Sequence, residues 1–201
     1  VVTATDSSVE PFGCLVDDPN SVDVEIVRWP AQGWRPIDHG TGNEGDCVEG
    51  VFHGRWQGDV LYGSNEAVRG QYVLGWSVDP QLASSEKPTA PRKQVIVWHM
   101  NYHPDGGQLF YPVEKTPFVF PVAVPGDDLD PEKVIALWCD GTRGLYIHPD
   151  IWHEGIFPLA DAQQFLDRQG RVHARVSCDF GQEFGVYLGV PLDGPTTRSS
   201  R

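Results

Sequence analysis

Histidine is the residue type whose number and spacing say most about chemistry in this chain. Seven histidines are present among 201 residues, and four of them fall in two short clusters. The first cluster contains His99 and His103, and the second contains His148 and His153. Histidine titrates near neutrality, so it can act as a general acid or base, and its neutral ring is a common metal ligand. These two clusters are therefore the first candidates for a functional site.

The residues around the first cluster read as an extended strand. Side chains alternate between the two faces of a strand, so we expect His99, Asn101 and His103 to share one face. The apolar Val95 and Val97 continue the same row. We interpret this row as the inner face of a barrel that is apolar at one end and polar at its mouth. The opposite face would carry Trp98, Met100 and Tyr102.

The spacing of Asn101, His103 and Gln108 resembles the first cupin motif, in which two histidines and a glutamate place metal ligands inside a β-barrel. The second cupin motif supplies another histidine, and His153 stands where it is expected. The candidate metal-binding set is therefore His103, Gln108 and His153, with Zn, Ni, Mn or Fe as the candidate divalent metal. Amides are poorer ligands for such metals than imidazole or carboxylate, so a metal-free site stays open as well.

The elements that would position these residues are mostly strands. Glycine (22) and proline (17) recur throughout, which limits uninterrupted helix and favours short strands joined by turns. Alternating or apolar runs predict strands at residues 22–29, 51–56, 72–76, 94–102, 108–113, 118–124, 134–138, 145–147, 172–178 and 184–190. Residues 161–169 are the clearest helix candidate, with Asp161 as N-cap and Gly170 as the stop.

The length of the chain indicates a single domain. We predict an N-terminal β-rich half over residues 1–80, a possible linker over 81–91, a cupin core over 92–190 and a flexible tail over 191–201. The predicted fold class is mainly β: a cupin-type double-stranded β-helix barrel with an N-terminal β-rich extension and one or two short helices.

Several stretches of the chain resemble the ureidoglycolate lyase family of the cupin superfamily. They are residues 103–112 (HPDGGQLFYP), residues 122–128 (VAVPGDD), Gly144, His148 and the pair Trp152-His153. The resemblance extends over about residues 95–160, and residues 11–13 are similar to the opening of that family's chain. It implies an enzyme of purine catabolism, in allantoin degradation, that splits ureidoglycolate into glyoxylate and urea.

This reaction needs a base for the hydroxyl proton, an acid for the departing nitrogen and a partner for the carboxylate. We assign His103 and His153 as the acid/base pair, Gln108 as the group that orients the substrate, and His99 as a further catalytic candidate. The substrate-binding candidates are Asn101, Tyr102, His148, Arg143 and Trp152. Arg55 and Arg69 are additional candidates for holding the substrate carboxylate.

One departure from the family keeps other functions open. Members typically show Glu-Arg-His-Pro where this chain has Asn101-Tyr102-His103-Pro104, so a carboxylate and a guanidinium are both missing. A related small carboxylate is therefore an alternative substrate. Two further alternatives are a metal-dependent cupin with isomerase or dioxygenase activity, and a non-catalytic cupin that binds a small ligand.

The composition narrows the classes of possible binding partner. With 28 acidic against 15 basic residues, the formal net charge is -13, which disfavours nucleic acid and anionic membranes. No fingerprint for a nucleotide cofactor is present, so no organic cofactor is expected. Family resemblance and exposed barrel edges suggest a homodimer, and we expect a cytoplasmic protein with four buried, reduced cysteines.

Two secondary predictions concern the rest of the chain. His39, His53 and His173 are expected to be structural or exposed, as isolated histidines in strands usually are. The glycine-rich segment 40–70 is expected to provide a second wall of the pocket, because loops on a rigid barrel often carry specificity.

Overall fold

The computed structural model describes residues 1–42, 44–68 and 70–195. These residues form a protein built mainly of strands, which confirms the predicted fold class. The strands are β1 (Val2–Thr3), β2 (Gly13–Val16), β3 (Glu44–Gln57), β4 (Val60–Asn65), β5 (Gly70–Trp76), β6 (Gln94–Val97), β7 (His99–Tyr102), β8 (Gln108–Pro112), β9 (Phe118–Ala123), β10 (Ile135–Cys139), β11 (Gly144–Ile147), β12 (Trp152–His153), β13 (Phe157–Pro158), β14 (Ala162–Val172), β15 (Val176–Asp179) and β16 (Leu188–Pro191).

Helical structure in the described residues is short and lies at the edges of the fold. The α-helices are α1 (Asp6–Val9) and α2 (Phe180–Phe184), and the 3-10 turns are η1 (Pro19–Ser21) and η2 (Pro131–Lys133). Thr5 begins α1 with a capping box shared with Ser8, which satisfies backbone N–H groups that such a short helix cannot pair internally. None of the helices in the described part of the chain has the length and apolar character needed to cross a bilayer.

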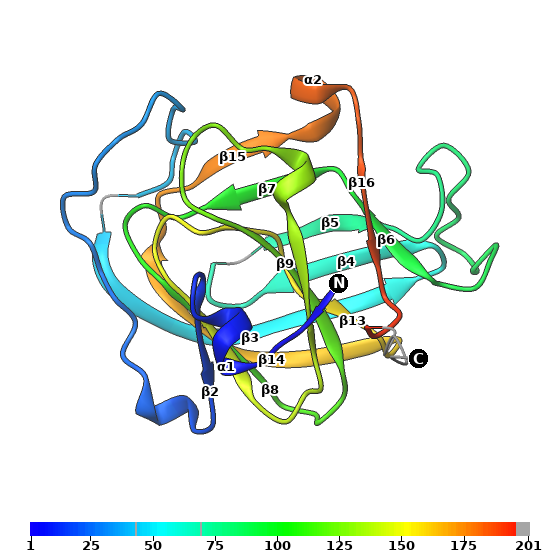
Figure 1. The fold of residues 1–201 in the computed structure, drawn as a ribbon, viewed down its shortest axis with the longest axis horizontal. Coiled ribbons are helices and arrows are strands. Elements are labelled where there is room, and N and C mark those ends of the chain that lie inside the picture. The colour runs from blue at the N-terminus through cyan, green and yellow to red at the C-terminus, as the bar shows by residue number, and fades with distance from the viewer. Residues whose placement is uncertain (43, 69, 196–201) are drawn as a thin grey trace, which may run out of the picture.

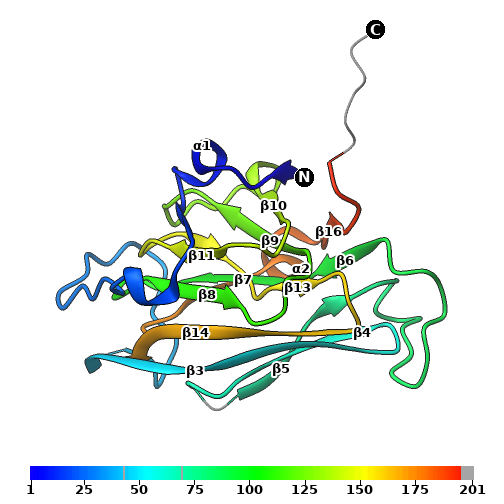
Figure 2. The same ribbon diagram turned by 90° about the horizontal axis from the view of Figure 1, so that it is seen from below.

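The strands form two sheets that face each other. One sheet has seven strands in the order β1-β10-β9-β12-β7-β15, with β13 also paired to β9. The other has nine strands in the order β16-β6-β5-β4-β3-β14-β8-β11-β2. Figure 2 shows the long strands β3 and β14 along the bottom with β9 and β10 above them, and Figure 1 shows β7 and β15 crossing one end. The space between the sheets holds both the apolar core and the candidate site.

Aromatic side chains from both sheets fill the apolar part of this space. Phe52 of β3 packs edge-on against Phe110 of β8, with ring centroids 5.7 Å apart. Phe118 of β9, in the opposite sheet, packs edge-on against Phe165 of β14 at 5.0 Å. These rings are buried, so they supply much of the apolar area that holds the sheets together.

The predicted helix over residues 161–169 is wrong, because this segment lies in strand β14. Gln163, Phe165, Asp167 and Gln169 are buried and alternate with more exposed residues, which is the period of a strand. Residues such as Gln, Leu, Asp and Arg have no strong β propensity, and the polar inward positions hide the apolar alternation. Pairing with β3 on one side and β8 on the other overrides the local preference.

The connection between β5 and β6 contains the segment that the sequence marks as a possible linker. It is held to the β3–β4 turn by Asp59, a buried carboxylate that accepts hydrogen bonds from the backbone of Ser84 and from the backbone and hydroxyl of Thr89. At the other end of the chain, Pro191 ends β16 and Leu192 is buried, while residues 196–201 of the predicted tail lie outside the described residues.

Burial of the cysteines is mixed. Cys139 and Cys178 are buried free thiols, as predicted. Cys14 and Cys47 are free but exposed, so the prediction of burial is wrong for these two. Both lie on strands of the nine-stranded sheet, at positions whose side chains point away from the core.

Candidate functional site

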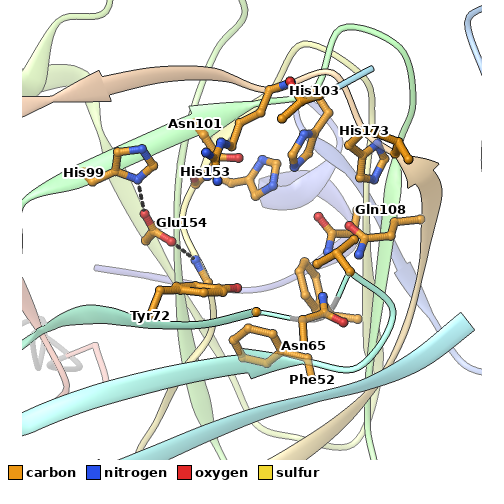
Figure 3. Close-up of a pocket in the computed structure, with 18 of the residues that line it drawn as sticks. Phe52, Asn65, Tyr72, His99, Asn101, His103, Gln108, His153, Glu154 and His173 are labelled. Atoms are coloured by element: carbon orange, nitrogen blue, oxygen red, sulfur yellow. Dashed lines mark hydrogen bonds and ion pairs between the residues drawn. The ribbon is translucent and has the colours of Figure 1, made fainter. Parts of the chain in front are cut away.

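A cavity of about 600 Å³ opens between the two sheets (Figure 3). The seven-stranded sheet contributes His99 and Asn101 from β7 and His153 from β12. The nine-stranded sheet contributes Phe52, Asn65, Tyr72, Gln108 and Gln169 from β3, β4, β5, β8 and β14. A volume of this size suits a small organic molecule.

Strand register explains why distant residues meet here. His153 lies directly opposite Asn101 across the β12–β7 pair, so the two side chains share the inner face. Gln108 lies directly opposite Gln169 across the β8–β14 pair on the facing sheet. The cavity is thus lined by two cross-strand pairs that face each other from opposite sheets.

Three imidazoles form a cluster on one wall of the cavity: His103, His153 and His173. His103 stacks on His173 with ring centroids 4.1 Å apart and an interplanar angle of 15°. The His103 and His153 centroids are 5.1 Å apart, and Phe120 stacks on His153 at 5.9 Å. Each ring is at most 9% exposed, so solvent does little to stabilise a charge here.

Hydrogen bonds fix the tautomers of these rings. His103 donates from Nδ1 to the Ala174 carbonyl at 3.0 Å, and His153 donates from Nδ1 to the Ile151 carbonyl at 2.8 Å. Because a carbonyl can only accept, the proton of each neutral ring lies on Nδ1 and Nε2 keeps its lone pair. His173 has the same tautomer for a different reason, since its Nε2 accepts the backbone N–H of Gly170.

Burial keeps two of these rings neutral. It lowers the pKa of His153 to about 4, partly opposed by the Ile151 carbonyl and the nearby Glu154 carboxylate. It lowers the pKa of His103 well below the usual range, and His173 and His153 add to the effect. At neutral pH both rings are therefore bases rather than acids.

A buried carboxyl group lies behind Gln108. Asp167 is 1% exposed and accepts a 2.6 Å hydrogen bond from Gln108 Nε2 and a 3.0 Å bond from Asn65 Nδ2. Burial raises the pKa of Asp167 to about 6 against the stabilising effect of these two amides. Since Asp167 takes the Nε2 end of Gln108, the amide oxygen is the end left for a ligand.

A carboxylate and an imidazole form a second polar pair in the cavity. His99 donates from Nδ1 to Glu154 Oε2 at 2.7 Å, and the Gly155 backbone N–H donates to Glu154 Oε1 at 2.8 Å. Tyr72 lies beside this pair with its hydroxyl directed into the cavity (Figure 3). Tyr72 as a whole is 40% exposed, but its hydroxyl lies in the cavity, where loss of solvation and the nearby Glu154 and Asp167 raise its pKa.

Two arginines line the cavity near the end of β14. Arg175 forms a 2.7 Å ion pair through Nε with Asp38, and Arg171 forms an ion pair with Asp46. A guanidinium has five N–H donors, so an arginine already paired with an aspartate can still bind a ligand carboxylate.

The structure brings together five of the candidates that the sequence identifies. Those that line the cavity are His99, Asn101, His103, Gln108 and His153. The predicted second wall is confirmed, because residues of segment 40–70 also line the cavity, among them Thr41, Phe52 and Asn65.

Four other candidates lie away from the cavity. Tyr102 points to the opposite face of β7, where its hydroxyl donates to Asp127 at 2.6 Å. Trp152 is fully buried, with its indole N–H bound to the Gly126 carbonyl. His148 is exposed and packs on Tyr146, and Arg143 pairs with acidic residues near α1.

The additional arginine candidates are not placed in the cavity either. Arg55 is exposed on β3 and does not line the cavity, and Arg69 lies outside the described residues.

Sequence reasoning missed several cavity residues. His173 is grouped there with structural histidines, yet it stacks on His103. Glu154 follows His153 directly, so strand alternation would place it on the other face. It lines the cavity because β12 ends at His153, so the alternation of the strand does not extend to Glu154. The polar residues at the inward positions of β14 would have indicated the polar cavity if the pattern had predicted a strand there.

The donor set does not match a three-ligand metal site. In the part of the chain that the structure describes, no group of three or more His, Cys, Asp or Glu side chains is arranged to hold a metal ion. Of the candidate ligands, His103 and His153 offer Nε2, whereas Gln108 offers an amide oxygen, which is a weak donor for Zn, Ni, Mn or Fe.

Comparison with known proteins places the chain in a family. The profile of the ureidoglycolate lyase family matches residues 73–181, more than half of the chain. The chain belongs to the ureidoglycolate lyase family. The matched residues include most of the polar side chains that line the cavity, from His99 of β7 to Arg175 just before β15.

Individual relatives agree with this placement. The chain is 36% identical to ureidoglycolate lyase of Azotobacter vinelandii over 94 residues, which cover 44% of this chain and 55% of the relative. It is 34% identical to ureidoglycolate lyase of Pseudomonas savastanoi pv. phaseolicola over 94 residues, which cover 46% of this chain and 55% of the relative. The chain thus spans about half the length of the curated ureidoglycolate lyases it matches.

Proposed function

We propose that this member of the ureidoglycolate lyase family is a carbon–nitrogen lyase acting on ureidoglycolate or a related small carboxylate. The observation that carries the proposal is the pair of neutral imidazoles, His103 and His153, each held by Nδ1 with Nε2 available in the cavity. Family membership supports the same reaction class.

In this reaction His153 acts as a proton shuttle. Its Nε2 takes the hydroxyl proton of the substrate, the carbinol C–O bond becomes a carbonyl, and the C–N bond breaks. The departing urea nitrogen then receives the same proton from Nε2. Because the pKa of His153 is about 4, its protonated form is a strong enough acid to return the proton readily.

His153 is better suited to this role than His103. The nearby Glu154 carboxylate favours the protonated form of His153. His103 faces His173, His153 and Arg175, all of which oppose a positive charge on its ring. We therefore assign His103 the role of a hydrogen-bond acceptor that orients the substrate, together with the Gln108 amide oxygen.

The substrate carboxylate would bind at Arg175 and Arg171. Arg143, the arginine that the sequence suggested for this role, lies in a separate depression beside α1. The net charge of -13 makes local arginines necessary for holding any small anion.

The test is release of glyoxylate and urea from ureidoglycolate, measured by separate coupled assays. We expect His153→Ala to lower kcat at least about 100-fold, the usual contribution of a positioned acid/base group. His53→Ala is the matched control, because His53 is a surface histidine paired with Glu66. Absence of both products from the folded wild-type protein would refute the proposal.

Two alternatives give different outcomes. Stoichiometric transition metal that is lost in His103→Ala would favour a metal-dependent isomerase or dioxygenase. Tight binding of a small carboxylate with no product would favour a non-catalytic binding protein.

We further propose a homodimer that acts in the cytoplasm on a small molecule, without nucleic acid or membrane partners. The acidic net charge supports the choice of partner class. Light scattering of the purified protein tests the dimer.

A further inference from the structure

The cavity separates its polar groups onto two sides. Figure 3 shows His99, Glu154 and Tyr72 on one side and His103, His173 and Gln108 on the other. Glu154 is 6% exposed and borders the cavity, so its carboxylate is available to a bound molecule while it is shielded from bulk water. A shielded carboxylate attracts cationic N–H donors more strongly than an exposed one.

Glu154 is the acidic side chain among the described residues that line the cavity, which also include two arginines. The ionisable side chains other than histidine and tyrosine are Glu154, Arg171 and Arg175. Both arginines are paired with aspartates, Asp46 and Asp38, so each pair is neutral as a unit. This leaves Glu154 as the charge that no arginine in this lining balances.

Asp167 adds to the negative side of this balance. It lies behind Gln108, and its pKa of about 6 leaves it mostly ionised at neutral pH. A ligand that carries a positive charge besides its carboxylate therefore gains an attraction at Glu154 that a purely anionic ligand lacks.

We propose that the cavity selects a small zwitterion, in which a guanidinium or amidinium group binds at Glu154 and a carboxylate binds at Arg175 and Arg171. This inference rests on the proposed function and names its substrate class: a guanidino counterpart of the neutral ureido group. Glu154 would determine specificity through its charge.

The geometry of Glu154 suits such a group. Its two oxygens each accept one hydrogen bond, from His99 and from the Gly155 backbone. A carboxylate oxygen has two lone pairs, so each keeps one acceptor position. Two parallel N–H donors of a guanidinium can use these positions, whereas a ureido group offers its donors without the charge.

The lyase step balances for this substrate. His153 takes the hydroxyl proton of 2-guanidino-2-hydroxyacetate, the C–N bond breaks, and the leaving nitrogen receives the proton. The products are glyoxylate and guanidinium, with no net proton released and no co-reactant consumed.

Two unreactive ligands isolate the charge. Guanidinoacetate and N-carbamoylglycine have nearly the same shape, differ in one positive charge, and lack the hydroxyl needed for cleavage. We expect calorimetry on the wild-type protein at neutral pH to show guanidinoacetate binding at least about tenfold more tightly. Equal or weaker binding of guanidinoacetate, or no measurable binding of either ligand, would overturn the inference.

Variants then test which residue produces the preference for guanidinoacetate over N-carbamoylglycine. Glu154→Gln keeps the shape and an acceptor but removes the charge, so the preference for guanidinoacetate should disappear. Glu66→Gln is the control, because Glu66 also pairs with a histidine but is exposed outside the cavity. Retention of the preference in a folded Glu154→Gln protein would overturn the assignment of Glu154.

Failure of this inference can be told apart from failure of the lyase proposal. Cleavage of ureidoglycolate by a protein that does not prefer guanidinoacetate would leave the lyase standing and remove the zwitterion. Preferential binding of guanidinoacetate, without cleavage of ureidoglycolate or of 2-guanidino-2-hydroxyacetate, would support the zwitterion site and refute the lyase.

Discussion

Asp167 gives the sharpest test of the electrostatics of the cavity. The carboxyl group is 1% exposed, and burial raises its pKa from 3.8 to about 6. The folded state therefore holds the proton more tightly than the unfolded state does. Below about pH 4 Asp167 is protonated in both states, so it does not lower the free energy of unfolding. As the pH rises toward 6, Asp167 ionises first in the unfolded state, and the folded state loses stability relative to it.

The size of this loss follows from the two pKa values. Their difference corresponds to about 3 kcal/mol, present in full above about pH 6 and absent below about pH 4. Asp167→Asn removes the ionisation. We expect the stability of the wild-type protein relative to this variant to fall by about 3 kcal/mol between these limits.

Urea denaturation followed by tryptophan fluorescence measures this difference at a series of pH values. Other groups titrate in the same range, but they are present in both proteins, so the difference isolates Asp167. Asp23→Asn, at an exposed position, is the control and should change little with pH. A difference between wild type and Asp167→Asn that stays constant from pH 4 to 6, or that changes with the opposite sign, would refute the reasoning.

Three other predictions follow from the same site. The rate of cleavage should decline as pH falls through about 4, because His153 must be neutral to take a proton. A pH profile of kcat/KM measures this decline, and a decline already complete near pH 6 would contradict the prediction. Arg175→Ala should raise KM for an anionic substrate about tenfold with a smaller effect on kcat, as steady-state kinetics would show; an unchanged KM would contradict its role at the substrate carboxylate. Tyr102→Phe should lower the free energy of unfolding by about 1–3 kcal/mol, because Asp127 loses a charge-assisted hydrogen bond, and a urea titration that shows no loss would argue against that bond.

The sequence predicted the parts of this protein that depend on local pattern. Frequent glycine and proline, with short alternating runs, indicated a mainly β fold, and the two sheets confirm it. Alternation along residues 99–103 placed His99, Asn101 and His103 on one face, and all three line the cavity. Residues 103–112 and 122–128 pointed to the family that the wider comparison shows.

Local pattern failed where long-range pairing decides the conformation. Strand β14 looks helical by composition, and only its pairing with β3 and β8 makes it a strand. That error also hid Asp167 and Gln169, whose inward positions follow from the strand period.

Only the tertiary structure could decide the electrostatic character of the site. The sequence supplied His103 and His153 as an acid/base pair, but burial between two sheets makes both rings neutral bases. The sequence also supplied the net charge, but it does not determine where the charged side chains lie in space. Folding brings Glu154 into the cavity and takes Arg143 away from it, because charge placement depends on strand register and chain turns, which act between residues far apart in sequence.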